Sequence, residues 1–274
     1  MQPIENILGK IQQLPSLPTL VMEIMGSVNN DQVDVATLVG KISQDPALTM
    51  KVIRVANSSF FGLSRQIGSL KEAVMVIGFS SLRGLVTAAA LVNLFPSGVG
   101  NAFDGRHFWL HSIETGNCAK VLAKRLGVDP EIAFTAGLLH DIGRLVLGVY
   151  FYDEFLRVLD YRKNNGVSML ASEQAVLGLD HAALGAEVAE RWHLPPAIWM
   201  AVRDHHLDEG RQTTLAEIVY IADRLCRPQA AGGALAGESI HFAETLLRLG
   251  LDEAALNSVA EEMEPLNAGA RLLL

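Results

Sequence analysis

Cysteine is scarce in this chain of 274 residues: Cys118 and Cys226 are the two present, and neither belongs to a CxxC pair. Two isolated thiols argue against a disulfide framework and indicate a reducing compartment. We expect both to be small apolar side chains of the core. The N-terminal stretch MQPIENILGK also lacks the basic region and the following apolar stretch of a secretion signal. Together these absences predict a cytoplasmic protein.

Basic residues are outnumbered and nowhere form a run. Lys and Arg total 22 against 30 Asp and Glu, which gives a formal charge of −8. This balance argues against bulk nucleic-acid binding, which depends on neutralising phosphates. Long uncharged apolar runs are missing too: LRGLVTAAALVNLF is shorter than the ~20 residues that span a bilayer, and AFTAGLLHDIGRLVLGVYF carries His, Asp and Arg at its centre. We therefore expect no membrane span.

Alternation of period two and a βαβ rhythm are absent, whereas apolar residues recur at helical spacing. These apolar stripes cover 17–25, 35–42, 48–56 and 70–77. Asp45-Pro46 predicts the end of one helix and the start of the next. Gly78 predicts a helix stop, and Ser80-Ser81 a cap for the helix that follows. The pattern predicts an all-α fold.

Proline and glycine mark two breaks in the helical pattern. The better candidate for a linker is FPSGVGNAFDGRH, residues 95–107, and a weaker break begins at Pro228. No internal repeat of solenoid period occurs. The chain is therefore predicted to form two helical lobes, 1–100 and 101–227, followed by a C-terminal helical extension, 228–274.

All eight histidines follow residue 106, and most adjoin a carboxylate or one another. The pairs His140-Asp141 and His205-His206 close apolar segments, and Asp223 lies in the otherwise apolar IVYIADRL. Imidazole and carboxylate ligands drawn from several helices suit Fe, Mn, Zn or Ni in the core of a bundle.

Structural alternatives exist for each of these residues. A buried His140 is satisfied equally by hydrogen bonds, and Asp141 by amides near a helix end, with Gly143 easing the backbone there. Asp223 has Arg224 or a residue of a neighbouring helix as a potential partner. His193 and His241 are expected to be structural or surface residues.

The order His111, His140-Asp141, Asp223 resembles the H…HD…D signature of the HD superfamily of metal-dependent phosphohydrolases. His181, His205 and His206 follow the order of its HD-GYP branch, in which further histidines hold a second metal. The N-terminal segments LPSLPTLVMEIM, ISQDPALTMKVIRVANSSFFG and SLKEAVMVIGFSSLRGLV, together with ERWHLPPAIWMAVRDHH, are similar to HDOD domains, the HD-related output domains of bacterial signalling proteins. This resemblance covers about residues 8–225.

The resemblance implies that the second lobe is an HD-like helical bundle with a divalent metal site. The implied metal ligands are His111, His140, Asp141, His181, His205 and Asp223. The implied catalytic residues are Asp141, Arg144 as a phosphate contact, and His206 as ligand or acid. Two departures stand out: His206 is followed by LDEGRQTTLAEIVYIAD without a GYP motif, and Arg144 replaces the lysine that follows HDxG in HD-GYP enzymes.

The resemblance favours a cytoplasmic signal-transduction output module that acts by binding a protein or nucleotide partner. Because no receiver or sensory domain occurs in the sequence, we expect its input to come from another chain. If the chain is such a module, we expect only background phosphoesterase activity, because the loop that carries the GYP motif is absent. The alternative is a metal-dependent phosphohydrolase acting on a phosphomonoester or phosphodiester, and a third interpretation is a helical scaffold that retains its histidines without a function. Under the first two interpretations the His and Asp side chains converge on one polar cavity.

Overall fold

The computed structural model describes residues 9, 14–26, 35–58, 66–95, 102–206, 213–227 and 240–273. Within those ranges the regular elements are all helices and no strand occurs, which confirms the all-α prediction. The N-terminal helices are α2 (Thr19–Gly26), α3 (Val35–Ile42), α4 (Pro46–Ala56), α5 (Leu70–Ile77) and α6 (Phe79–Leu94). The bundle that follows comprises α7 (Gly105–Leu126), α8 (Pro130–Leu139), α9 (Ile142–Tyr150), α10 (Tyr152–Asn165), α11 (Met169–Leu177), α12 (His181–Arg191), α13 (Pro196–Asp204) and α14 (Thr214–Leu225). The chain then continues through α15 (Ile240–Leu249) and α16 (Glu253–Leu273).

Caps set the boundaries of the N-terminal helices. Asp45 Oδ1 accepts hydrogen bonds from the first amides of α4, and Pro46 opens that helix, as predicted. The predicted cap at Ser80 is wrong. α6 begins directly after Gly78, whose φ of 82° turns the chain between α5 and α6 without a side-chain cap. Ser80 instead donates a hydrogen bond to Glu131 of α8, 2.5 Å away.

Asn57 holds together the two ends of the segment that follows α4. Its Nδ2 donates to the carbonyl oxygen of Ile67, and its Oδ1 accepts from the Ile67 amide, both at 2.8 Å. We expect Asn57→Ala to lower the free energy of unfolding by about 2 kcal/mol, since each lost bond contributes about 1 kcal/mol. Urea unfolding measures the change. Asn164→Ala, at an exposed site of α10, is the control, and an equal response of both variants would contradict the role of Asn57.

The break between the lobes ends earlier than the sequence indicates. Residues 96–101 lie outside the described part of the chain, and α7 begins at Gly105, so the predicted linker overlaps the first turn of this helix. The reason is Asp104, whose Oδ1 accepts from the His107 amide at 2.9 Å and caps α7. Buried apolar residues on both sides of the break form one continuous core. The division into separate lobes therefore stays a prediction.

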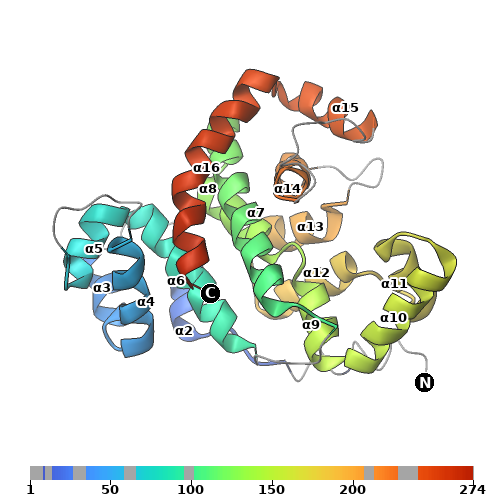
Figure 1. The fold of residues 1–274 in the computed structure, drawn as a ribbon, viewed down its shortest axis with the longest axis horizontal. Helices are drawn as coiled ribbons and strands as arrows, with labels where there is room; N and C mark the ends of the chain where they lie inside the picture. The colour runs from blue at the N-terminus through green and yellow to red at the C-terminus, as the bar shows by residue number, and fades with distance from the viewer. Residues whose placement is uncertain are drawn as a thin grey trace.

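The C-terminal helix α16 connects the two parts of the molecule. Figure 1 shows it running beside α7, with the N-terminal helices on its other side, and it contacts α7, α4 and α6. Within the contact with α7, Asn117 Nδ2 donates to the buried Asn267 Oδ1 at 3.0 Å. Helix α16, which belongs to the segment predicted to be a C-terminal extension, thus packs against both the N-terminal helices and the bundle.

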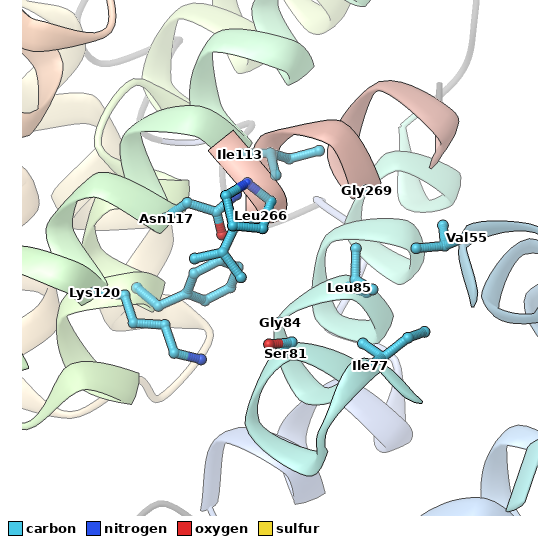
Figure 2. Close-up of a pocket in the computed structure, with 12 residues that line it drawn as sticks. Val55, Ile77, Ser81, Gly84, Leu85, Ile113, Asn117, Lys120, Leu266 and Gly269 are labelled. Carbon is cyan, nitrogen blue, oxygen red and sulfur yellow. The ribbon is translucent and has the colours of Figure 1, made fainter. Parts of the chain in front are cut away.

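A small, mostly apolar cavity of about 120 Å³ remains where the N-terminal helices meet α7, α8 and α16. Figure 2 shows Ile77 and Leu85 facing it from one side and Ile113 and Leu266 from the other, with Lys120 at its edge. Lys120 is already held by Glu131, 2.8 Å away. The two parts of the molecule therefore meet through an apolar contact that is incompletely filled.

The segment Pro130–Tyr150, which contains α8 and α9, is long and apolar enough by composition to cross a membrane. However, 83% of its most apolar window is buried inside the protein. Leu138 and Leu139, which directly precede the His140-Asp141 pair, have no exposed surface. The apolar character of this segment is thus that of a core element.

Candidate metal centre

The packing of α7 on α8 brings the first two histidines together. A Cβ on Gly137 of α8 would lie 2.9 Å from the Cα of Gly116 and 2.9 Å from the Thr115 carbonyl oxygen of α7. Only glycine permits this approach of the two backbones. The close packing of the two helices places the ring of His111, on α7, and the ring of His140, at the end of α8, with their centroids 5.2 Å apart.

His140 and Asp141 lie at the break between α8 and α9. Asp141 occupies the N-cap position of α9, yet its side chain makes no cap hydrogen bond. Its carboxylate instead faces the histidines, with Oδ1 3.1 Å from His181 Nε2. Glycine is required at position 143 because α9 and α12 approach each other closely there. A Cβ at this position would lie 2.0 Å from the His181 carbonyl oxygen. The expectation that Gly143 eases the backbone is replaced by this contact between α9 and α12.

Glu173 is a buried residue of the site that sequence reasoning missed. Its Oε2 accepts hydrogen bonds from both the backbone amide of His181, at 2.9 Å, and the ring Nδ1, at 2.5 Å. Glu173 has no exposed surface. In the sequence it lies in ASEQAVL, which reads as an ordinary helix with an exposed carboxylate; its nearness to His181 arises from tertiary packing.

Backbone carbonyls orient two further rings. Nδ1–H of His140 donates to the Gly137 carbonyl at 2.7 Å, and Nδ1–H of His205 donates to the Val202 carbonyl at 2.6 Å. A carbonyl oxygen can only accept, so these bonds place a proton on Nδ1 of each ring and leave Nε2 as the nitrogen that faces the carboxylates. Among the described residues, no hydrogen-bond partner reaches His140 Nε2, His205 Nε2 or Asp141 Oδ1.

The candidate ligands form two adjoining groups, in each of which the potential ligand atoms lie within 4.8 Å of one another. One comprises His111, His140 and Asp223, and the other Asp141, His181, His205 and His206. His140 Nε2 lies 3.5 Å from Asp141 Oδ2 and 3.7 Å from Asp223 Oδ1, and His205 Nε2 lies 3.6 Å from Asp141 Oδ1. The expected convergence is thus confirmed, whereas the roles of these residues as ligands stay predictions.

These separations resemble those of ligands around a shared ion. Two atoms bound at ~2.0–2.2 Å to one cation are roughly 2.8–3.6 Å apart. Several buried lone pairs facing carboxylates at such distances repel one another unless a proton or a cation lies between them. The donor set of imidazole nitrogens and carboxylate oxygens suits Fe, Mn, Zn or Ni. The residues present therefore fit a divalent transition metal.

Burial and neighbouring charge set the protonation of the cluster. Burial disfavours a charged Asp141, but Arg144, His140 and His181 outweigh it and hold its pKa well below the usual range. Burial likewise opposes ionisation of Asp223, and the histidines His111 and His140 keep its pKa low. The centre therefore carries two anionic carboxylates.

The buried histidines differ in the direction in which their pKa is shifted. Burial lowers the pKa of His140, but Asp141 and Asp223 outweigh this effect and raise it to about 10. Burial lowers the pKa of His205 and, together with positive charge on its neighbours, that of His206. A neutral His206, with its Nε2 2.8 Å from His181 Nε2, suits a ligand better than a general acid.

One side of the centre is open to solvent. His111, Arg144 and Arg227 keep 15%, 27% and 35% of their side chains exposed, whereas His140, His181 and His205 keep none. Arg144 Nη1 donates to Asp141 Oδ2 at 2.7 Å, which leaves its role as a phosphate contact a prediction.

The pairing suggested between Asp223 and Arg224 is corrected. Asp223 pairs instead with Arg227, one helical turn further on, at 3.2 Å from Nε, because residues at i and i+4 share a face. The alternative of a partner on a neighbouring helix is confirmed by His111 of α7, 3.1 Å away. Arg224 lies over the ring of Tyr220 instead.

His193 is exposed and His241 half-buried beside Tyr220. Both lie outside the two ligand groups.

Comparisons with known proteins identify relatives of this fold. A solved Shewanella amazonensis SB2B protein, provisionally named a phosphohydrolase, matches with a TM-score of 0.78 and 28% identity over 98% of both chains. An HDOD domain protein of unknown function from Geobacter sulfurreducens matches with a TM-score of 0.79 and 25% identity over 99% of both.

Two curated relatives match over part of their length. An uncharacterized Treponema pallidum (strain Nichols) protein is 27% identical over 73% of this chain and 39% of its own. Ribonuclease Y of Mycoplasma mycoides subsp. mycoides SC is 32% identical over 63% of this chain and 30% of its own. The chain thus spans about a third of the length of these relatives. The HDOD domain model matches residues 14–207, well over half of the sequence, and the chain therefore belongs to the HDOD domain family.

Proposed function

We propose that this HDOD chain binds two divalent transition-metal ions in its His/Asp centre and hydrolyses phosphate esters there. The observation that supports this proposal is the set of buried, tautomer-assigned histidines whose Nε2 atoms face carboxylates without a hydrogen-bond partner among the described residues. A module that only docks a partner protein has no need for such a costly arrangement. The provisional phosphohydrolase name of the Shewanella relative and the ribonuclease name of the Mycoplasma relative point to the same class of chemistry.

The seven His and Asp residues of the two groups would supply the metal ligands. His111, His140 and Asp223 would hold one ion, and His181, His205 and His206 the other, with Asp141 between the two groups. Ions bound in this way lower the pKa of a coordinated water and neutralise charge on the phosphoryl oxygens. Coordination requires a neutral ring, so His140 must lose its proton when the centre is loaded.

The open side of the centre provides the approach for a phosphate group. Arg144 and Arg227 flank it, each bonded to one of the carboxylates, at Asp141 and Asp223 respectively. A planar guanidinium has five donors, so one arginine can hold its carboxylate and still meet a phosphate oxygen. Both side chains are thus positioned to orient an ester.

A reconstitution assay tests the proposal. Protein stripped by chelation is reloaded with Mn²⁺, Fe²⁺, Zn²⁺ or Ni²⁺ and assayed on p-nitrophenyl phosphate and bis(p-nitrophenyl) phosphate. We expect turnover with at least one ion and none in the stripped protein. Background rates with every ion, as anticipated for a pure output module, would overturn the proposed function.

Glu173 is expected to be a positioning residue, since it contacts His181 and belongs to neither group of candidate ligands. Glu173→Gln removes the charge that orients the His181 ring, and loss of such an outer partner typically weakens metal affinity by about 10–100-fold. The dissociation constant for Mn²⁺, measured by titration calorimetry, checks this. Glu187→Gln, at an exposed site of α12, should bind as the unmodified protein does. Equal affinities of all three proteins would remove Glu173 from the site.

The signalling role implied by the family is compatible with this chemistry. We propose that a protein or nucleotide partner regulates the chain or is regulated by it.

A further inference from the structure

A second and larger hollow lies beside the metal centre, between α7, the end of α14 and α16. Its volume is about 480 Å³, within the ~300–1,000 Å³ typical of ligand pockets. We call it the α16 pocket. The residues that line it include His111 and Arg227. His111 Nε2 also lies 3.1 Å from Asp223 Oδ1, so one histidine belongs to both the pocket and the centre.

The lining of the α16 pocket is apolar with a rim of paired charges. Its apolar side chains come from all three helices: Leu110, Leu225, Leu256, Val259 and Met263. On the rim, Arg271 lies 3.7 Å from Glu114 and 3.6 Å from Glu264. Counting Arg227, two arginines and two glutamates line the pocket, so its formal charge is zero with neutral histidines.

Size and charge together indicate what this pocket can accept. A phosphate gains little from a neutral, apolar pocket, whereas the adjoining centre offers the two arginines and, when loaded with metal, would offer cations as well. An uncharged organic group of more than one ring gains by burying its apolar surface, at roughly 25 cal/mol per Å². One molecule that carries both groups fills the centre and the pocket together.

We propose that the α16 pocket binds the uncharged organic group of a phosphate ester whose phosphate lies at the metal centre. This rests on the proposed function and narrows its substrate class to esters with a bulky, largely apolar organic group. Helix α16 then belongs to the substrate site, although it lies outside the region matched by the family model, residues 14–207.

Binding of non-hydrolysable phosphonates tests the inference without relying on turnover. The probes are methylphosphonate, (1-naphthylmethyl)phosphonate and the neutral 1-naphthylmethanol, titrated by calorimetry into Mn²⁺-loaded protein. We expect the naphthyl phosphonate to bind at least about tenfold more tightly than methylphosphonate, because an aromatic group buries a large apolar area.

Ala260→Trp places a large ring in the pocket from an exposed position of α16. We expect this variant to lose the tenfold preference while it keeps its affinity for methylphosphonate. Ala254→Trp, exposed on the same helix but outside the lining, is the matched control and should keep the preference. Circular dichroism and Tm show that both variants fold.

The possible results distinguish a failure of the α16 pocket assignment from a failure of the proposed phosphate-ester hydrolysis. Equal binding of both phosphonates, or a preference that survives in Ala260→Trp, would overturn the pocket assignment and leave the metal chemistry standing. Naphthylmethanol bound by the unmodified protein and excluded by Ala260→Trp, without binding of methylphosphonate, would support the pocket and refute the proposed function.

Discussion

Asp141→Asn is expected to reduce metal-dependent phosphoesterase activity by at least about a hundredfold, because several kcal/mol of charge stabilisation depend on the ions of the centre. Asp141 is the residue through which the two ligand groups meet: Oδ1 faces His181 and His205, and Oδ2 faces His140. Asparagine keeps the shape of the side chain but removes its negative charge and one acceptor oxygen. The metal content and kcat/KM of the variant are to be measured on the same preparation.

Asp160→Asn is the control for this experiment. Asp160 is exposed on α10, and its loss of charge should change neither metal content nor turnover. If Asp141→Asn retained both at the level of the control, the shared-ligand role of Asp141 would be refuted.

Gly143→Ala is expected to lower the free energy of unfolding by about 3 kcal/mol, the upper range for overpacking. The new Cβ would lie 2.0 Å from the His181 carbonyl oxygen and 2.9 Å from the Gly185 amide nitrogen. Both are backbone atoms of α12, so no side-chain rotation relieves the overlap and α9 must move away from α12. Because these helices carry Asp141 and His181, metal affinity should fall as well.

Urea unfolding of the stripped protein measures the stability change without a contribution from bound metal. Gly105→Ala is the matched control: Gly105 opens α7, and a Cβ there meets nothing within 4 Å. Alanine favours a helix over glycine, so this change should be neutral or slightly stabilising. A Gly143→Ala protein as stable as the control would show that the approach of α9 and α12 is not required.

The sequence was most informative where local chemistry decides the structure. Apolar periodicity predicted the helices, and Asp45-Pro46 predicted a helix start that the structure confirms. The His/Asp residues drew attention because buried polar groups in apolar segments need a partner, and they do converge.

Features that depend on tertiary packing could not be predicted. Glu173 has the local context of an exposed helical carboxylate, and only the contact of its side chain with His181 shows its role. Gly143 suggested a flexible backbone, whereas the requirement is imposed by a carbonyl of α12. The segment from Pro228 onward looked peripheral, but α16 packs on α7 beside the centre. The stretch after His206, in which the GYP motif is missing, lies outside the described residues up to position 212.

Metal stoichiometry tests the central claim most directly. Stripped protein is dialysed to equilibrium against Mn²⁺ or, under anaerobic conditions, Fe²⁺, and its metal content is measured by mass spectrometry. Since the ligands form two groups, we expect about two ions per chain in the unmodified protein and a clear loss in Asp141→Asn. Less than one ion per chain at saturating metal would contradict the assignment of this His/Asp centre as a metal site.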